Sequence, residues 1–342
     1  MIEFVYGMFC ENAQGIITFD LFLFIILALF LSLAIDVFFG ELPGKVHPVV
    51  VMGSIINFFK NIFIGIKNRI SGLLVVIGCV IVTSAILFII YYIGSYNVIL
   101  LFIIFSILLS SSYSVSMLLQ TAIDVKSDLN ESIDKARRSV SYLVSRNTDE
   151  LTESFIVSAV IESLTENITD SYVAPIFYYF IFGIIILIKP FDHCLYFLLL
   201  VPMLYRLSNT MDAMLGYETD ELKNIGFFPA KLDDVLNYVP ARIAGLYVVI
   251  SAYLLKLDGK NSFKVMMRDA RKSPSPNSGF TMASTAGALN IQLIKKDTYI
   301  LGDDNKEITK DDISKAVSLS KLSIILFTIT IIVLFTLIYV IL

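Results

Sequence analysis

Runs of about twenty apolar residues recur along this chain and set the strongest limit on its fold. Three of them are nearly uninterrupted, at 21–39, 72–93 and 322–342. A helix needs about 20 mostly apolar residues to cross the hydrocarbon core of a bilayer. Charged residues make up only 16% of the 342, well below the roughly 25% of soluble domains. The sequence therefore predicts an all-α, polytopic helical membrane protein.

Four other apolar runs are less clear. The run 98–118 is long enough to span but is Ser-rich in its second half, and 172–188 is slightly short. The runs 191–205 and 243–257 are shorter still, so each could be a tilted span, a re-entrant segment or a buried helix. Because no basic region or cleavage site accompanies the first run, 21–39, we expect a retained span there and no cleaved signal peptide.

Lysine and arginine are concentrated in three segments. Of the 26, four lie in 40–71, five in 119–171 and sixteen in 206–321, whereas residues 1–20 contain none. Positive residues favour the cytoplasmic side of a membrane. We therefore expect the N-terminus outside, these three segments in the cytoplasm, and a single membrane domain. About six crossings result if 243–257 is re-entrant or packs at the inner surface.

Some classes of protein are excluded by composition. A net charge of −4 gives no reason to expect a nucleic acid or another polyanion as the partner. Cys10, Cys79 and Cys194 lack the paired spacing of a disulfide framework or a zinc site, and only two histidines are present. The remaining question is whether the few charged residues form a catalytic face or only connect the spans.

The strongest candidate site is a stripe of acids. Glu162, Glu166 and Asp170 recur every four residues, which places them on one face of a helix that leads into an apolar run. Stacked carboxylates repel one another unless a cation lies between them, and hard oxygen ligands suit Mg²⁺ together with substrate phosphates. The alternative is a solvated helix face. The absence of Lys and Arg between the acids, and the adjacent membrane segment, favour a functional site.

Two basic segments suit oxyanions. Guanidinium groups in RRSVSYLVSRNT at 137–148 could bind phosphate or carboxylate in a bidentate manner, although a positive-inside anchor explains that segment better when it is taken alone. The Pro-rich segment 268–279 combines cations with hydroxyl and amide groups, but it is not a Walker A loop. The candidate substrate-binding residues of the two segments are Arg137, Arg138, Arg146, Arg268, Arg271, Lys272, Ser275 and Asn277.

A further polar stretch extends from Arg206 to Arg242. Asn209 and Asp212 share a helix face, and the pair Asp233–Asp234 could hold a second metal ion or orient an amine. An Asp–Asp pair is weak evidence by itself, because helix starts also favour aspartate.

The segment 36–53 opens with an aspartate at the end of an apolar run and continues through a Gly/Pro turn that contains His47. A buried aspartate is a functional candidate in a membrane helix, and an interfacial loop is the equally good alternative.

Taken in order, these segments resemble the adenosylcobinamide-phosphate synthase family of cobalamin biosynthesis. The resemblance covers about residues 36–302. One departure is Lys231, where the family pattern has arginine. The matching segments are DVFFGELPGKVHPVVVMG at 36–53, RRSVSYLVSRNT at 137–148, SAVIESLTENITDSYVAPIFYY at 158–179, NTMDAMLGY at 209–217, AKLDDVLNYVPAR at 230–242 and RDARKSPSPNSG at 268–279.

This resemblance implies a membrane enzyme that forms an amide between adenosylcobyric acid and aminopropanol or its O-phosphate, at the expense of ATP and with Mg²⁺. It implies a corrinoid, a small amino alcohol and the lipid bilayer as partners, with a homo-oligomer or other corrinoid enzymes as further candidates. On this basis we expect His47, Asp233 and Asp234 to supply a base. Mg²⁺ ligands would be Glu162, Glu166, Asp170 and Asp212, and substrate-binding residues would include Asn209 and Arg242 beside the basic residues above.

Two other functions are compatible with the residues. A Mg²⁺-dependent transferase acting on a lipid diphosphate would use Asn209, Asp212 and Asp220, but their spacing is poor. A corrinoid or solute transporter would place polar groups near the midplane in repeated halves, whereas here they cluster at the predicted cytoplasmic ends.

Overall fold

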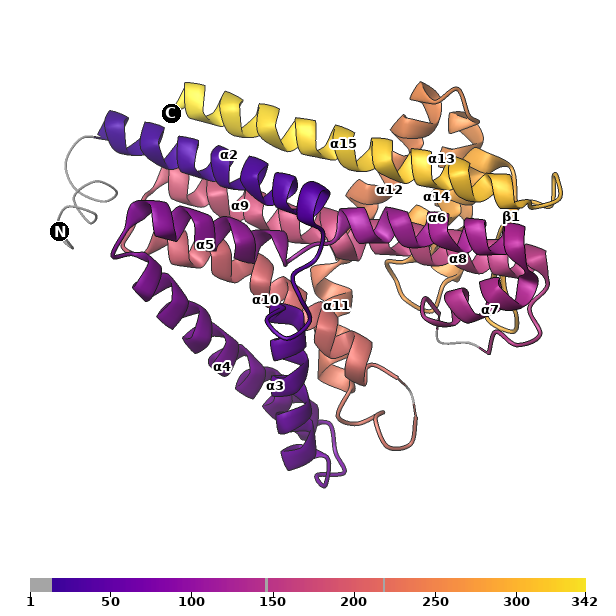
Figure 1. Cartoon of the computed structure of the whole chain (residues 1–342), viewed down its shortest axis with the longest axis horizontal. Coiled ribbons are helices and arrows are strands. Elements are labelled where there is room, and N and C mark those ends of the chain that lie inside the picture. Colours follow the sequence, from indigo (N-terminus) through magenta and orange to yellow (C-terminus); the bar gives the residue numbers. More distant parts are fainter. Residues whose placement is uncertain (1–13, 145–146, 218) are drawn as a thin grey trace. The chain divides into compact units, whose positions relative to one another are not determined.

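The computed structural model describes residues 14–144, 147–217 and 219–342, which are mainly helical and contain almost no strand (Figure 1). The predicted all-α class is confirmed. The chain forms two compact units: unit 1 comprises Met1–Ser114, Ala174–Leu236 and Ile331–Leu342, and unit 2 comprises Val115–Val173 and Asn237–Thr330. The single membrane domain expected from the sequence stays a prediction.

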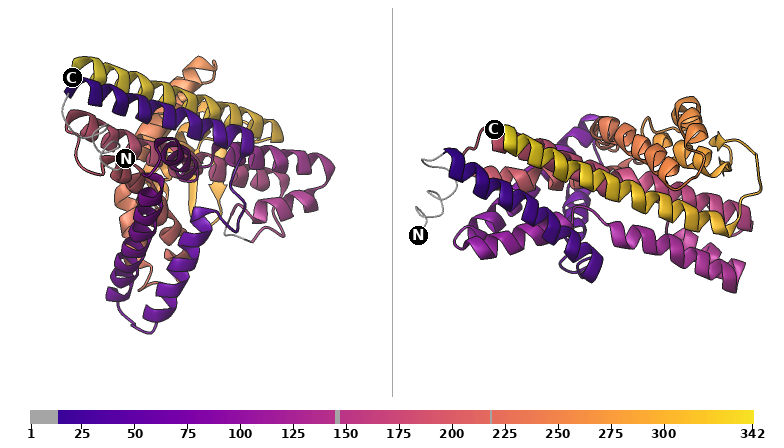
Figure 2. Two further views of the ribbon diagram at one scale, coloured as in Figure 1. Left: turned by 60° about the vertical axis from the view of Figure 1, so that its left-hand side comes forward. Right: turned by 90° about the horizontal axis from the view of Figure 1, so that it is seen from above.

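Unit 1 is built from long apolar helices. The helix α2 and the C-terminal part of α15, which come from opposite ends of the sequence, lie side by side in Figures 1 and 2, and the rings of Phe22 and Tyr339 stack with centroids 4.5 Å apart. The elements of unit 1 are α2 (Gln14–Phe39), α3 (Pro48–Phe63), α4 (Ile70–Gly94), α5 (Val98–Ser110), α9 (Ala174–Ile188), α10 (Cys194–Leu215), α11 (Phe227–Leu236) and the end of α15 (Lys310–Ile341).

Six helices are long and apolar enough to cross a membrane, in agreement with the predicted number. The short run 191–205 belongs to the 22-residue helix α10, which continues to Leu215. The helix α12 (Tyr238–Leu254) has 17 residues and qualifies only when counted together with α11, which would raise the number to seven. The six candidate spans are Asp20–Phe39, Ile70–Gly94, Val98–Glu131, Glu153–Ile188, Cys194–Leu215 and Lys310–Ile341.

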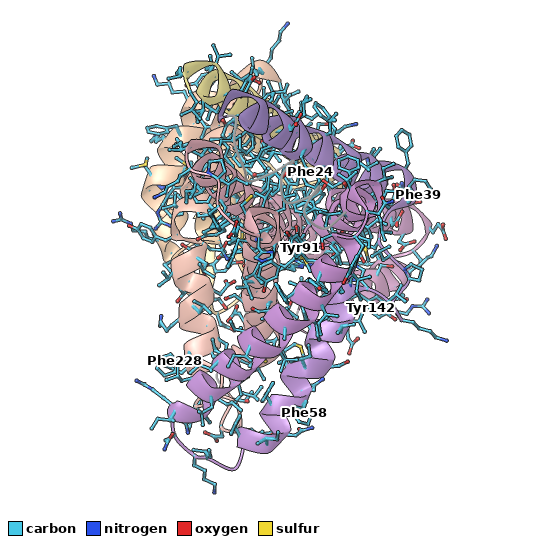
Figure 3. The ribbon with its side chains drawn as sticks, turned by 90° about the vertical axis from the view of Figure 1, so that its left-hand side faces the viewer. Phe24, Phe39, Phe58, Tyr91, Tyr142 and Phe228 are labelled. Carbon is cyan, nitrogen blue, oxygen red and sulfur yellow. The ribbon has the colours of Figure 1, made fainter. Side chains whose placement is uncertain are left out.

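Several of these helices expose apolar side chains, as expected for contact with lipid. Only 22% of the most apolar window of α4 is buried, and the share in α15 is the same. Phe39 at the end of α2 is 83% exposed and Phe58 on α3 is 61% exposed (Figure 3). Apolar patches of this extent are rare on soluble monomers. The chain therefore has the features of a multi-pass membrane protein.

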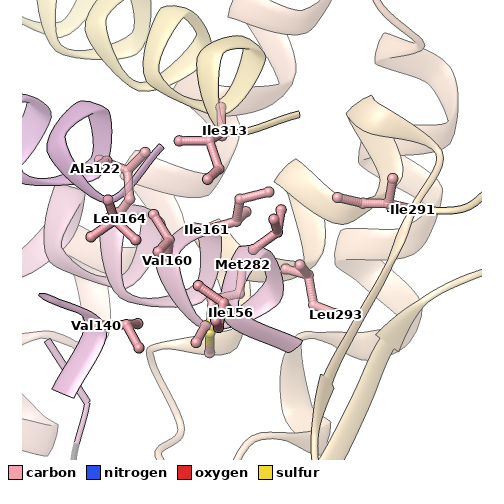
Figure 4. Packing of buried hydrophobic residues seen from close by; sticks show 14 of the residues in the cluster. Ala122, Val140, Ile156, Val160, Ile161, Leu164, Met282, Ile291, Leu293 and Ile313 are labelled. Atoms are coloured by element: carbon pink, nitrogen blue, oxygen red, sulfur yellow. The ribbon is translucent and has the colours of Figure 1, made fainter. Parts of the chain in front are cut away.

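Unit 2 has its own apolar core, centred on α8. Ile156, Val160, Ile161 and Leu164 pack with Met282 and with further side chains from the neighbouring elements (Figure 4). The elements of unit 2 are α6 (Val115–Glu131), α7 (Ile133–Ser141), α8 (Glu153–Ile168), the π-helix η1 (Thr169–Val173), α12, α13 (Gly259–Asp269), the 3₁₀-helix η2 (Ala270–Lys272), α14 (Gly279–Leu289), β1 (Gln292–Lys295), β2 (Tyr299–Gly302) and the first part of α15.

A small β-hairpin interrupts the helices of unit 2 and was not predicted from the sequence. The strand β1 pairs antiparallel with β2, with Leu293 opposite Leu301, and both leucines are fully buried. Asp297 in the turn has φ 58°, a left-handed conformation that aspartate tolerates better than most residues. Two four-residue strands leave little alternation to detect in a sequence. Two residues of the hairpin, Tyr299 and Gly302, donate hydrogen bonds to the buried carboxylates of Glu162 and Asp269.

Candidate functional site

A polar pocket lies in unit 2 between α8 and the hairpin. Its cavity volume is about 120 Å³, room for a few water molecules or a small organic ligand but not for a nucleotide. Two carboxylates and one ammonium group face the same small space. The lining residues are Leu143, Val144, Glu162, Ser163, Glu166, Asn167, Lys295 and Tyr299.

Glu162 is the most constrained residue of this pocket. Its side chain is 4% exposed, and Ser158 donates a hydrogen bond of 2.6 Å to its Oε1 atom. Tyr299 donates a second one of 2.9 Å to Oε2. The Ser158 hydroxyl in turn accepts a 2.9 Å hydrogen bond from the backbone N–H of Ile294 on β1. These contacts hold the carboxylate in one orientation. The sequence singled out Glu162 but not Tyr299, whose role depends on the hairpin.

The predicted three-acid stripe is not assembled as a metal site. In the described residues, no group of three or more His, Cys, Asp and Glu side chains could hold a metal ion. The reason is the π-helix Thr169–Val173, because its wider turn takes Asp170 out of the four-residue register of α8. Glu162 and Glu166 still share the pocket, whereas Asp170 does not line it and Asp212 belongs to unit 1. Two carboxylates suffice for an Mg²⁺ ion that keeps waters and substrate phosphates.

Asp269 organises the basic loop at 268–279. It is fully buried, and its carboxylate accepts hydrogen bonds from Arg268 at 2.7 and 2.8 Å and from the backbone N–H of Gly302 at 2.9 Å. The Lys272 ammonium lies 2.6 Å away, and Arg268 also pairs with Asp303 at 2.8 Å. Two of the predicted anion-binding cations are thus already paired with protein carboxylates. Sequence reasoning missed this role, because Asp269 looks like an ordinary surface counter-ion among arginines.

The pKa of Asp269 reflects this arrangement. Burial alone would raise it, but the hydrogen bonds from Arg268, Lys272 and Gly302 outweigh burial and lower the pKa of the carboxyl to about 2. The same contacts raise the pKa of the Arg268 guanidinium. Asp269 is therefore ionised at every physiological pH and serves as a fixed anchor for the loop.

Among the described residues, Arg242 and Arg271 are the cations of this region that have no acidic partner. The Arg242 guanidinium lies between the rings of Tyr238 and Phe280, at 3.6 and 4.3 Å from their centroids. It donates to the Asn277 side chain at 2.9 Å and to the carbonyls of Tyr238 and Pro276, all of which are neutral acceptors. Arg271 lies close enough to repel it electrostatically. Two neighbouring guanidinium groups held this way suit an anion between them.

The rest of the predicted loop residues are placed beside this pair. The Ser275 hydroxyl accepts the backbone N–H of Asn277 at 3.2 Å and so shapes the turn. Gly279 begins α14 directly against the Ala270 carbonyl oxygen, where a Cβ atom would collide with it. This close approach of α14 to η2 fixes the loop at its second end.

The arginines of α7 are bound to protein groups. Arg137 donates a hydrogen bond of 3.0 Å to the carbonyl of Leu151 and forms an ion pair with Asp134 at 2.8 Å. Arg138 donates a hydrogen bond to the carbonyl of Asp134. Arg146 lies outside the described residues. The positions of Arg137 and Arg138 fit a structural role at least as well as anion binding.

In unit 1, His47 caps the helix α3. Its Nδ1 accepts the backbone N–H of Val49 at 3.2 Å, so a neutral ring carries its proton on Nε2 and presents a donor. Burial lowers the pKa of His47, Glu41 opposes this, and Arg206 adds to the lowering. His47 is thus neutral at pH 7. Its capping bond occupies the nitrogen that a general base would use, which disfavours the predicted base role.

The remaining predicted residues of unit 1 come from α10 and α11, which pack together. Asp212 and Asp234 lie within electrostatic reach of each other, and Lys231 pairs with Asp234 at 2.9 Å. Asp233 is largely buried near Tyr178. Asn209 accepts a hydrogen bond from Arg206 at 3.3 Å. The structure therefore brings Asp212, Asp234 and Lys231 together where α10 packs against α11, with Asp233 next to Asp234 in the chain, and these carboxylates suit an amine.

The chain is similar to known proteins over most of its length. The profile of the family described as "CobD/Cbib protein" matches residues 29–320. The "Probable cobalamin biosynthesis protein CobD" of Methanothermobacter thermautotrophicus is 45% identical over 300 residues, which cover 88% of this chain and 94% of that protein.

Two further relatives carry similar names. The "Probable cobalamin biosynthesis protein CobD" of Methanococcus aeolicus is 40% identical over 92% of this chain and 97% of its own. The "Cobalamin biosynthesis protein CobD" of Dehalococcoides mccartyi is 35% identical over 85% of this chain and 91% of its own. No solved structure matches the chain significantly.

Proposed function

The chain belongs to the CobD/CbiB family of cobalamin biosynthesis proteins, and from this we propose that it is a membrane-bound amide-forming ligase. Its substrates are adenosylcobyric acid and an amino alcohol, aminopropanol or its O-phosphate. The product is adenosylcobinamide or its phosphate. The reaction consumes ATP, and the active face lies on the cytoplasmic side with the N-terminus outside.

The need for ATP follows from the chemistry of the acid. A carboxylate does not acylate an amine until one of its oxygens becomes part of a leaving group. Transfer of the γ-phosphoryl group to that oxygen yields an acyl phosphate and ADP. Attack by the neutral amine then forms the C–N bond, expels phosphate and releases one proton. Positioning and offset of phosphate charge supply most of the catalysis in such a transfer.

The arginine pair of unit 2 is the main structural support for ATP as a substrate. Arg242 and Arg271 lie near each other, and in the part of the chain that the structure describes neither has an acidic partner. Arg242 is held rigidly by two aromatic rings and by the loop that begins at Asp269. A preformed pair of guanidinium groups suits the oxygens of a polyphosphate.

The pocket beside α8 offers two carboxylates to an Mg²⁺ ion. Glu162 and Glu166 both line this pocket, and the hydrogen bonds from Ser158 and Tyr299 hold the Glu162 carboxylate in place. We assign these two residues to the ion, which would offset phosphate charge when bound. Asp170 is left out because it does not line the pocket.

The acids of unit 1 suit the amine. Asp233 and Asp234 would bind an ammonium group, and Asp233, largely buried, is the better candidate to take up its proton. Asp234 is partly neutralised by Lys231 at 2.9 Å. His47 is a weaker base candidate because of its capping bond.

A direct assay tests this function. The purified full-length chain in detergent is incubated with adenosylcobyric acid, Mg-ATP and either aminopropanol or its O-phosphate, and the corrinoid is analysed by mass spectrometry. We expect a corrinoid amide and one ADP for each amide formed. Consumption of a prenyl diphosphate would support the transferase instead, and substrate flux into vesicles without chemical change would support a transporter.

A further inference from the structure

Arg206 lies within an apolar helix, an unusual position for an arginine. It lies inside α10, a candidate membrane span, after an uninterrupted apolar stretch from Cys194 that includes Pro202. Arginine within a membrane helix is costly and, when present, faces a partner or an aqueous cavity. The run of apolar residues ends at 205 in the sequence, so Arg206 looks like the residue after a span. The structure shows instead that the helix continues for nine more residues.

Its guanidinium is poorly satisfied by the protein. Among the described residues, its only hydrogen bond is the 3.3 Å contact from Nη1 to the Asn209 amide oxygen. The Nε atom is fully buried and has no acceptor there. A guanidinium has five N–H donors, and leaving buried donors without acceptors costs roughly 1–3 kcal/mol each. An arginine of this kind is suited to an acceptor that arrives with a ligand.

The surroundings supply a second donor. The helix α3 packs against α10, and His47 at its N-terminus is near enough to Arg206 to interact electrostatically. Because Nδ1 of His47 is occupied by the Val49 N–H, the free Nε2–H of the neutral ring is a donor. A cation and a neutral donor together define a site for an oxyanion.

The charges nearby limit the anion. The same unit holds Asp212 on α10 and the pair Asp233–Asp234 on α11; Asp212 and Asp234 lie within electrostatic reach of each other, and Lys231 pairs with Asp234. These acids disfavour a dianionic phosphate or a polyphosphate but tolerate a single carboxylate, especially one next to an ammonium group.

We propose that Arg206, supported by Asn209 and the His47 N–H, binds the carboxylate of the acid substrate. This inference rests on the proposed function, since it identifies that carboxylate as the one to be converted into the amide. Arg206 is a substrate-binding residue that fixes the acid beside the aspartates that receive the amine. Sources of the same oxyanion chemistry, such as the amino alcohol phosphate and ATP, are separated by the test below.

The experiment compares two corrinoids that differ at the reacting group. Dissociation constants of adenosylcobyric acid and of adenosylcobinamide, in which that carboxylate is an amide, are measured by equilibrium dialysis with the full-length chain in detergent. The wild type is expected to prefer the acid. In Arg206→Gln the affinity for the acid falls about 10- to 100-fold, as lost charge-assisted hydrogen bonds predict, while affinity for the amide is unchanged.

Two further variants serve as controls for Arg206→Gln. Lys60→Gln removes a cation of unit 1 from α3 at its far end and is expected to leave both constants unchanged. Arg206→Lys keeps the charge but loses the fork of donors, so its preference for the acid should be intermediate, and it serves if Arg206→Gln does not fold. ATP and aminopropanol phosphate are measured with every variant.

The binding results distinguish failure of the carboxylate site from failure of the proposed function. An unchanged preference for the acid in both Arg206 variants overturns the inference, and so does a loss that falls on ATP or aminopropanol phosphate instead. If the wild type prefers the acid through Arg206 but makes no amide with any amine, the proposed function fails and the carboxylate site stands. If the wild type binds no corrinoid acid, both fail.

Discussion

Asp269 in unit 2 and Arg206 in unit 1 are both charged residues with buried atoms, but they differ in how many hydrogen bonds and ion pairs the protein gives them. Asp269 receives hydrogen bonds or ion pairs from Arg268, Lys272 and the Gly302 N–H. Arg206 has one long hydrogen bond, to Asn209, within the described residues. A buried charge that the chain itself satisfies builds structure, whereas one that it leaves under-satisfied is suited to a ligand.

The same contrast separates the two regions by their ligands. The loop of unit 2 pairs Arg268 and Lys272 internally and leaves Arg242 and Arg271 for an anion. In unit 1, Arg206 lies on the same helix as Asp212, and Asp212 is within electrostatic reach of Asp234. We therefore assign phosphates to the arginine pair of unit 2, and the carboxylate and the amine to unit 1.

The largest effect is expected from Asp269→Ala. The substitution removes the buried carboxylate that Arg268, Lys272 and the Gly302 N–H share. Each lost charge-assisted hydrogen bond costs about 1.5–3 kcal/mol, and hydration of the partly exposed Arg268 and Lys272 offsets part of that sum. The thermal unfolding midpoint in detergent should fall steeply, and ATP-dependent turnover should be lost with it.

The matched control is Asp303→Asn. This acid also pairs with Arg268, but its side chain is 37% exposed, so the cost should stay below about 1 kcal/mol. Equal losses in the two variants would show that Asp269 is not the anchor of the loop.

The next effect is steric. Gly279→Ala places a methyl group on the Ala270 carbonyl oxygen, so α14 must move away from η2, at a cost of about 1–3 kcal/mol. The KM for ATP should rise more than the KM for the corrinoid. Gly65→Ala is the control, because open space surrounds that position and no change is expected. A stable Gly279→Ala protein with wild-type kinetics would contradict the role given to this contact.

Acid titration gives a second measure of how much the Asp269 carboxylate stabilises the protein. The pKa of Asp269 is lowered from an ordinary value of 3.8 to about 2. Its contribution, about 2 kcal/mol, is therefore fully present above pH 4 and is lost as the pH falls from about 4 towards 2. Unfolding midpoints measured across this range should drop in the wild type and drop less in Asp269→Asn. Parallel curves for the two proteins would disprove the assignment.

The smallest effect concerns the pocket beside α8. Tyr299→Phe removes one hydrogen bond to Glu162, at a cost of about 1 kcal/mol, but leaves the carboxylate in the pocket. We expect a slight loss of stability and a clear fall in activity, because Glu162 becomes less well oriented. Glu162→Gln should lower activity further at a similar stability. Full activity in Glu162→Gln would rule out Glu162 as a ligand of Mg²⁺.

The sequence predicted the spanning helices well because the length of an apolar run is a local property. It missed where α10 ends, because Arg206 looks like the end of the run, although the helix continues to Leu215. Of the acidic stripe, Glu162 and Glu166 line one pocket and Asp170 does not, since it lies in a π-helix that depends on the backbone hydrogen-bond register. The anchoring role of Asp269 needs Gly302, 33 residues away, and no local pattern records that contact.

The division of ligands between the two regions is tested most directly by one set of kinetic constants. The KM of ATP and the KM of adenosylcobyric acid are measured side by side in Arg271→Gln and Arg206→Gln. We predict that Arg271→Gln raises the KM of ATP about 10-fold or more and leaves that of the acid unchanged, and that Arg206→Gln does the reverse. If both variants raise the same KM, or if the effects are exchanged, the division of ligands is wrong.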